Sequence, residues 1–156
     1  MLRKAKISDA KDIHALVNHY AQSGIMLPRS LSDIYDNIRD YFVIDDGDKI
    51  KGCVALHISW EDLAEVKALA VDESAKGKGW GKKLVDACLK EAKELGIKRV
   101  FALTLIPEFF KKAGFKPISK KKLPQKVWGE CINCFKFTEC DEVSLAYDLE
   151  NGKNSH

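Results

Sequence analysis

The spacing of hydrophobic residues changes repeatedly along the chain, and each change predicts a new element of secondary structure. Hydrophobic residues that alternate with polar ones, or that form short apolar runs, predict strands, and those that recur every three or four residues predict helices. Strands are expected at 2–7, 41–45, 50–60, 63–71, 99–105 and 143–149, and helices at 9–22, 30–39, 84–95 and 107–113.

This order of elements predicts an α/β fold, with a mixed central sheet of about six to seven strands flanked by about four helices. No linker, repeat or low-complexity segment divides the chain, so one domain is expected over residues 1–150. Residues 151–156 are polar and are expected to form a flexible tail.

A period of two assigns the side chains of a strand to its two faces. In the strand at 50–60 it places the even-numbered residues together, and in the strand at 63–71 the odd-numbered ones. The second set brings Glu65 and Lys67 side by side in an otherwise apolar strand. Burying charge is costly unless the charge is paired or used. The two residues therefore form either a structural ion pair or a catalytic carboxylate beside a cationic anchor.

Composition limits the range of functions. The chain has 156 residues, 46% of them hydrophobic and 31% charged, which is typical of a globular protein. A net charge of +3 is too small to indicate nucleic-acid binding. No apolar run is long enough to span a membrane, and the N-terminus lacks the apolar core of a signal peptide. A cytoplasmic protein without a membrane or nucleic-acid partner is expected.

The segment from Lys76 to Gly81 predicts a binding site for phosphate. Its sequence, Lys-Gly-Lys-Gly-Trp-Gly, joins a predicted strand to a predicted helix. Glycines allow the backbone to approach a ligand, and the helix N-terminus favours an anion. The segment lacks the Gly-Lys-Ser/Thr ending of a Walker loop and the Gly-x-Gly-x-x-Gly spacing of a dinucleotide loop.

A basic residue, two spacers and Gly-x-Gly directly after a strand resemble the acetyl-CoA pyrophosphate loop of the GNAT acetyltransferase superfamily. The order of elements and the Phe109-Phe110…Gly114-Phe115 segment are also similar to that family along nearly the whole chain. The resemblance implies a GNAT fold, with acetyl-CoA as the acetyl donor. It assigns acetyl-CoA binding to Leu69, Ala70, Val71, Lys76, Gly77, Lys78, Gly79, Trp80, Gly81, Lys82 and Phe110.

Within the superfamily, several segments resemble the acetyltransferase domain of N-acetylglutamate synthase in its short, stand-alone form. These segments are 24–30, 52–56, 64–71, 101–104, 123–124 and 128–142. The resemblance implies acetyl transfer to L-glutamate in a ternary complex, as in arginine biosynthesis. It gives Glu65 the role of general base and Arg29 a contact to the substrate. Lys67 is a candidate second anchor for the substrate, and Thr104 a further candidate catalytic and substrate-binding residue.

One residue departs from the superfamily pattern. Many members have a tyrosine where this chain has Phe110, and that tyrosine protonates the leaving CoA thiolate. A phenylalanine cannot donate a proton. Either the thiolate leaves unassisted, or a hydroxyl such as that of Thr104 or Tyr147 assists.

The five cysteines are expected to be reduced thiols or metal ligands rather than disulfides. Cys131 and Cys134 have the Cys-x-x-Cys spacing of a metal-binding pair, and Cys140 follows, but a fourth ligand is not close in sequence. No bound metal is therefore expected, and these three cysteines are the candidate ligands if one binds. Two other functions stay open: an acetyltransferase for another amine, and a non-catalytic acyl-CoA-binding or metal-sensing module. The sequence also leaves the oligomeric state open, a homodimer included.

Overall fold

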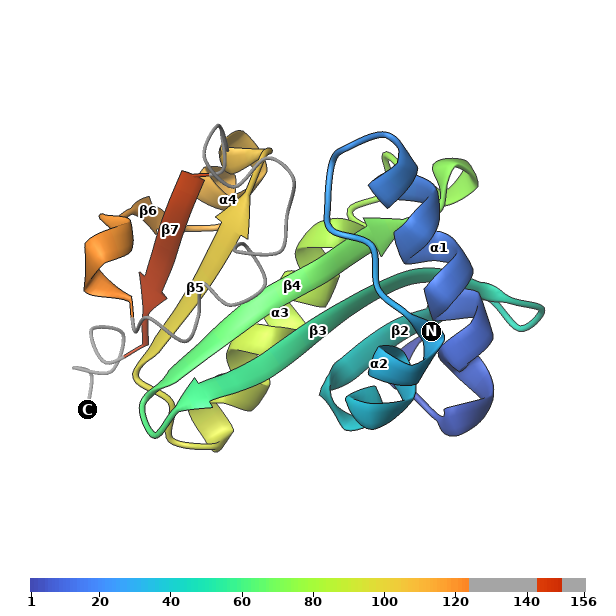
Figure 1. The fold of residues 1–156 in the computed structure, drawn as a ribbon, viewed down its shortest axis with the longest axis horizontal. Coiled ribbons are helices and arrows are strands. Elements are labelled where there is room, and N and C mark those ends of the chain that lie inside the picture. The colour runs from blue at the N-terminus through green and yellow to red at the C-terminus, as the bar shows by residue number, and fades with distance from the viewer. Residues whose placement is uncertain (124–142, 150–156) are drawn as a thin grey trace.

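The computed structural model describes residues 1–123 and 143–149. They form a mixed α/β fold with a seven-stranded sheet and four α-helices, which confirms the predicted architecture (Figure 1). The strands are β1 (Leu2–Lys4), β2 (Tyr41–Asp45), β3 (Ile50–Trp60), β4 (Leu63–Val71), β5 (Arg99–Thr104), β6 (Lys116–Pro117) and β7 (Val143–Asp148). The helices are α1 (Ala10–Gln22), α2 (Leu31–Asp36), α3 (Trp80–Glu94) and α4 (Pro107–Lys112).

The sheet has the order β1-β2-β3-β4-β5-β7-β6 and opens between its two central strands. All neighbouring strands are antiparallel except β4 and β5, which pair in parallel. Their pairing runs from Leu63 opposite Arg99 to Glu65 opposite Phe101. Beyond Glu65 the two strands diverge, as Figure 1 shows. On the edge of β4 that faces β5, backbone groups in the second half of the strand therefore face an opening instead of a neighbouring strand.

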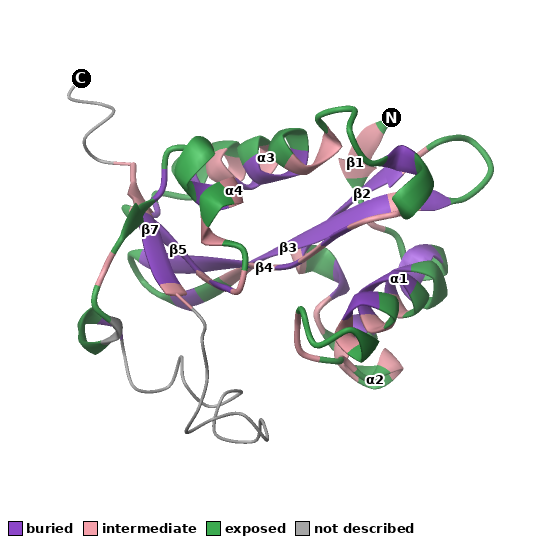
Figure 2. Cartoon of the chain, turned by 90° about the horizontal axis from the view of Figure 1, so that it is seen from above, coloured by how far each residue is buried: buried purple, intermediate pink, exposed green. Residues whose placement is uncertain are grey.

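Helices cover both faces of the sheet (Figure 2). On one face, α3 buries Leu84, Val85 and Cys88 against Val54 and Leu56 of β3. On the other face, α1 and α2 bury Ile13, Val17 and Ile34 against Tyr41 and Cys53. Both layers are needed to hold β4 in place, because its two faces contact different cores.

The first two helices begin and end differently from the prediction. A 3-10 turn, Ile7–Asp9, precedes α1, and the Asp9 carboxylate accepts hydrogen bonds from Arg3 and from the Lys6 N–H instead of capping the helix. The second helix ends at Asp36 instead of Arg39, and a separate 3-10 turn, Ile38–Asp40, leads into β2. That turn places Asp40 beside the sheet.

A bulge in β4 overturns part of the predicted face assignment. Ala68 has φ of 55°, the one non-glycine residue with a positive φ in the described part of the chain. Ala68 and Ala70 pack in the core under α1, whereas Leu69 and Val71 pack against the core under α3. Glu65 and Lys67 share a face as predicted, but Leu69 and Val71 do not share it with them. The bulge reverses the alternation at Ala68.

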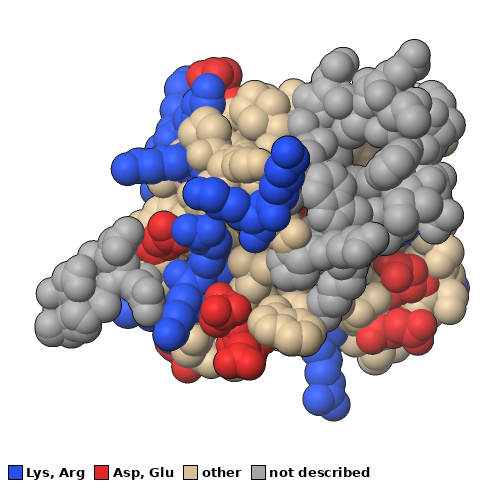
Figure 3. Space-filling model, turned by 60° about the vertical axis from the view of Figure 1, so that its left-hand side comes forward, with Lys and Arg blue, Asp and Glu red and all other residues tan. Residues whose placement is uncertain are grey.

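Figure 3 views the side of the molecule that carries β6, where basic side chains lie close together. Lys116 of β6 is exposed, and so are Lys121 and Lys122 in a 3-10 turn. No helix in the described residues is long and apolar enough to cross a membrane.

Candidate active site

Two adjoining cavities lie where β4 and β5 separate. The larger has a volume of about 450 Å³ and the smaller about 100 Å³. Both are lined by Ile25, Met26, Leu69 and Ile106, so they form two compartments of one cleft. The α1–α2 loop closes one side of this cleft, and the turn between β5 and α4 closes the other.

The larger cavity lies against the glycine-rich segment predicted to bind phosphate. Gly77 and Gly79 have φ of 81° and 80°, and a Cβ added to either would meet no atom within 4 Å. They are glycines because of the backbone conformation, and the space in front of them is open. Gly81 is different: its Cβ would lie 3.3 Å from the Phe109 ring. That glycine allows α3 and α4 to approach closely.

Helix α3 directs its N-terminus at this cavity. Gly79 is its N-cap residue and supplies no side-chain hydrogen bond, so the first N–H groups are available to a ligand. The first turn carries Lys82 and no acidic residue. The helix dipole and the lysine together favour an anion at this position.

Lys76 adds a second cation to the lining of the larger cavity. Its ammonium lies 4.7 Å from the centre of the Tyr20 ring and 3.6 Å from the Glu73 carboxylate. The hydrogen bond with the Tyr20 side chain raises the pKa of Lys76, so this side chain stays charged. Tyr20 also donates to the carbonyl of Val71, which ties α1 to the end of β4.

The dimensions and chemistry of the larger cavity fit acetyl-CoA. An exposed helix N-terminus and lysines would hold the diphosphate, and the edge of β4 that has separated from β5, at Leu69, Ala70 and Val71, would meet the amide groups of the pantetheine arm.

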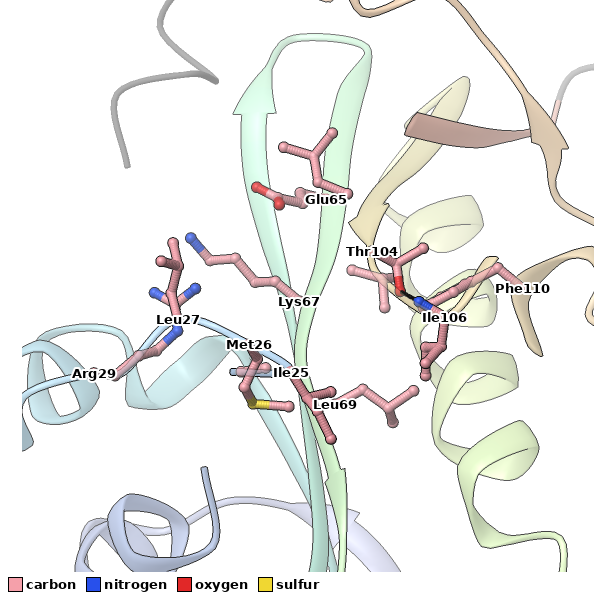
Figure 4. Close-up of a pocket in the computed structure, with 13 residues that line it drawn as sticks. Ile25, Met26, Leu27, Arg29, Glu65, Lys67, Leu69, Thr104, Ile106 and Phe110 are labelled. Atoms are coloured by element: carbon pink, nitrogen blue, oxygen red, sulfur yellow. Dashed lines mark hydrogen bonds between the residues drawn. The ribbon is translucent and has the colours of Figure 1, made fainter. Parts of the chain in front are cut away.

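The smaller cavity collects the charged residues singled out in the sequence. Glu65, with 9% of its surface exposed, and Lys67 come from β4, and Arg29 comes from the α1–α2 loop. Figure 4 shows their side chains directed to the same side of β4. Two cations and one carboxylate therefore line a single compartment.

Arg29 is held in place through its backbone. Its N–H donates to Asn18 Oδ1 at 3.1 Å, and its carbonyl accepts from Asn18 Nδ2 at 3.0 Å. The guanidinium lies 3.6 Å from the Asp33 carboxylate. The side chain is only 9% exposed. The two hydrogen bonds with Asn18 of α1 thus fix the position of Arg29 in the loop, which the sequence alone does not predict.

Thr104 and Phe110 line the smaller cavity from the other side of the cleft. Thr104 Oγ1 accepts a hydrogen bond from the Ile106 N–H at 2.9 Å, drawn dashed in Figure 4. The Thr104 hydroxyl hydrogen is still available to a ligand. Tyr147, the other hydroxyl considered, packs its ring on Phe115 and lines neither cavity.

The structure also separates two adjacent phenylalanines. Phe110, which is predicted to contact acetyl-CoA, is buried and lines the smaller cavity, and Phe109 lines the larger one. Four further residues line the cleft without having been predicted as site residues: Phe109, Tyr20, Ile25 and Met26. The apolar loop that ends at Arg29 is the sequence feature from which Ile25 and Met26 could have been predicted to line the site.

Comparison with known proteins decides the family. The model of the acetyltransferase (GNAT) family matches residues 12–115. The chain belongs to the GNAT acetyltransferase family. Members use acetyl-CoA as the acyl donor, so the predicted fold and cofactor are confirmed.

Three similar proteins narrow the kind of GNAT enzyme. An uncharacterised N-acetyltransferase of Chlorobaculum tepidum is 41% identical over 148 residues, which cover 95% of this chain and 96% of that protein. An amino-acid acetyltransferase of Mycobacterium tuberculosis is 34% identical, over 97% of this chain and 88% of the relative. N-acetylglutamate synthase from Neisseria gonorrhoeae, solved with coenzyme A and N-acetyl-glutamate, superimposes with a TM-score of 0.86 at 27% identity. That match covers 96% of this chain and 35% of the synthase. The chain is an acetyltransferase related to amino-acid acetyltransferases.

Two cysteines lie in the described residues, and both are buried core residues. Burial raises the pKa of Cys53 to about 12 and also raises that of Cys88. Among the described residues no group of His, Cys, Asp and Glu side chains could hold a metal ion. The candidate ligands Cys131, Cys134 and Cys140, like the tail at 151–156, lie outside those residues.

Proposed function

We propose that the protein transfers the acetyl group of acetyl-CoA to the α-amine of L-glutamate and releases N-acetyl-L-glutamate and CoA. The supporting observation is the set of charges around the smaller cavity, where Arg29 and Lys67 lie with Glu65. Glutamate carries two carboxylates and one ammonium, so its charges complement those of the site. The synthase and amino-acid acetyltransferase relatives make this acceptor the natural first choice.

In this proposal, Arg29 and Lys67 bind the two carboxylates. A guanidinium can engage a carboxylate through two parallel hydrogen bonds, which fixes its orientation as well as its position. With both carboxylates held, the ammonium lies near Glu65. Because the cavity adjoins the cofactor compartment through Leu69 and Ile106, the amine can be placed next to the thioester. Such placement supplies a large part of the rate enhancement.

Glu65 acts as the general base. An ammonium has no lone pair, so it must lose a proton before nitrogen can attack the thioester carbon. A backbone N–H in the segment Leu69–Val71 stabilises the oxyanion, since the bulge at Ala68 leads directly into it. Thr104 is the hydroxyl on the far wall of the smaller cavity that can assist departure of the thiolate.

The acceptor range separates this proposal from its alternatives. A polyamine or a lysine side chain would meet Arg29 and Lys67 as like charges, which disfavours both. Glutamine and aspartate keep part of the charge pattern and are the closest competitors. If glutamate is the acceptor, the enzyme serves arginine synthesis, a cytoplasmic pathway.

The experiment is a comparison of CoA release from acetyl-CoA with glutamate, glutamine, aspartate, spermidine and a lysine peptide as acceptors. We expect glutamate to give the highest kcat/KM and mass spectrometry to identify N-acetylglutamate. A higher kcat/KM for spermidine or the peptide would refute the acceptor. Absence of turnover with every amine, in protein that binds acetyl-CoA, would favour a non-catalytic module.

A further inference from the structure

A histidine lies directly across the sheet from the proposed base. In the antiparallel ladder between β3 and β4, His57 is the partner of Glu65. Side chains of directly opposed residues share a face, with Cβ atoms about 4.5–5.5 Å apart. The neighbouring pair, Ala55 opposite Lys67, extends the same face. His57 is therefore the titratable side chain of β3 that flanks Glu65.

Asp40 fixes the chemistry of this histidine. His57 Nδ1 lies 2.7 Å from Asp40 Oδ2, on the 3-10 turn that precedes β2. An ionised carboxylate can only accept a hydrogen bond, so Nδ1 carries the hydrogen and donates it. The neutral ring then has its lone pair on Nε2, which is able to accept a proton. Asp40 on the turn contacts the ring, Glu65 on β4 is its cross-strand partner, and Lys67 follows at the next paired position of β4 on the same face.

The two residues differ in their access to solvent. Glu65 has 9% of its surface exposed, whereas the side chain of His57 is 40% exposed. A proton on the buried Glu65 has little access to solvent, whereas a proton on His57 can pass to water directly. The pair thus connects the inside of the cleft to its outer rim.

The reaction needs such an exit. The acceptor enters as an ammonium and leaves as an amide with one hydrogen on nitrogen, so nitrogen loses two protons in each turnover. The departing CoA thiolate takes up one of them, and the other must reach solvent. The base has to be deprotonated again before the next ammonium binds.

We propose that His57, oriented by Asp40, relays this second proton from Glu65 to solvent. The relay rests on the proposed acetyl transfer with Glu65 as base, but it does not depend on which amine is the acceptor. The proton moves from the Glu65 carboxyl to Nε2 of His57, directly or through one water, and then to bulk water. Asp40 stabilises the imidazolium that forms between these steps.

The test is chemical rescue of His57→Ala, measured with whichever amine gives the highest CoA release in the wild type. We expect kcat to fall by roughly 10-fold, less than for loss of the base itself, with the KM for acetyl-CoA unchanged. Added imidazole should restore kcat in a concentration-dependent way, because the site of the lost ring is open to solvent. Asp40→Asn should lower kcat by a smaller factor. His14→Gln, a histidine on α1, serves as the matched control and should match the wild type.

Each outcome bears on the relay. Rescue of His57→Ala, with no rescue of Glu65→Gln, supports it. A kcat equal to that of the wild type overturns it, and so does a lowered kcat that imidazole fails to restore, which would assign His57 a structural role. Should His57→Ala not fold, His57→Ser, which also leaves the site of the ring open, takes its place with the same outcomes. Inactivity of the wild type toward every amine would refute the proposed function. That outcome is seen with the wild type alone and is thus distinct from failure of the relay.

Discussion

The thiol of Cys53 donates a hydrogen bond to the backbone carbonyl of Ala68, across 3.4 Å from β3 to β4. Ala68 is the bulge residue, and its carbonyl lies in the core under α1. Past the bulge, Leu69 packs against the core under α3 and lines both compartments, whereas Glu65 and Lys67 line only the acceptor compartment. The buried Cys53 thiol thus stabilises the bulge at Ala68, where the side-chain alternation of β4 reverses.

Replacing Cys53 should cost more stability than replacing Cys88. Both thiols are fully buried, and each alanine variant loses one sulfur atom. Only Cys53→Ala also leaves the Ala68 carbonyl without its donor, so its free energy of unfolding should fall by roughly 1 kcal/mol more. Urea denaturation of Cys53→Ala and Cys88→Ala measures the difference. Equal losses would mean that the thiol does not support the bulge.

Glu65→Gln should leave acetyl-CoA binding intact and lower kcat by roughly 10²–10⁴-fold, because glutamine has a similar shape but cannot accept the proton. Steady-state kinetics and calorimetry on the same preparation separate the two effects. Glu94→Gln, on an exposed position near the end of α3, is the control and should be neutral. A rate close to the wild-type value for Glu65→Gln would move the role of base to another group.

Gly79→Val should weaken acetyl-CoA binding by roughly 10-fold or more. Gly79 has φ of 80°, where a branched side chain is strained, and the new side chain would enter the space in front of the loop. Gly47→Val is a matched control, since Gly47 has φ of 98° with equal free space but lies in the β2–β3 turn. Both variants should lose similar stability, and only Gly79→Val should lose affinity. Equal affinities would place the diphosphate elsewhere.

Asp9 should make folding sensitive to acid. The hydrogen bond from Arg3, together with that from the Lys6 N–H, holds the pKa of Asp9 below its usual range. The folded state therefore binds this proton less readily than the unfolded chain does. The stability that results is present above the unfolded pKa of about 3.9 and is lost as pH falls through the lower folded pKa.

Asp9→Asn should lower the free energy of unfolding at pH 7 by about 2–3 kcal/mol, because the charged hydrogen bonds to Arg3 are lost. Its unfolding free energy should also vary less with pH below about pH 4. Thermal or urea unfolding across this pH range checks both statements. A pH dependence as steep as that of the wild type would assign the acid sensitivity to other carboxylates, such as Asp45, whose pKa is also lowered.

Local sequence patterns predicted most of the fold because they report which side chains face the core. The strands and helices appeared at their observed positions within a few residues, and the glycine-rich loop appeared at the strand–helix junction. The bulge at Ala68 was missed, since alanine is small enough to fit either face and the alternation on both sides looked continuous. Ile58 and Trp60 were expected on the same face as Val54. Ile58, opposite Ala64, keeps the face of Val54 but is largely exposed. The pairing of β3 with β4 shifts between Ile58 and Trp60, and Trp60 is exposed too.

The candidate site was predictable only in part, for a similar reason. Glu65 and Lys67 were found from their charge in an apolar strand, and the position of Arg29 depended on a resemblance. The contact that fixes Arg29, its double hydrogen bond with Asn18, joins residues 11 apart and leaves no periodic pattern. Likewise, the pairing of His57 with Glu65 depends on the register of two strands, and that with Asp40 on the 3-10 turn, which the predicted helix at 30–39 concealed.

The most direct measurement is the KM for glutamate of Arg29→Ala, determined beside that for acetyl-CoA. Loss of a charged contact whose partner stays buried costs about 2–5 kcal/mol, so the KM for glutamate should rise by roughly 30-fold or more. The KM for acetyl-CoA should not change, and Arg29→Lys should recover only part of the loss, because an ammonium cannot present a planar fork. Arg39→Ala, at an exposed arginine, should behave as the wild type. If Arg29→Ala instead weakens turnover of glutamate and of an amine without a carboxylate equally, Arg29 supports the loop alone, and glutamate is not the acceptor that this site selects.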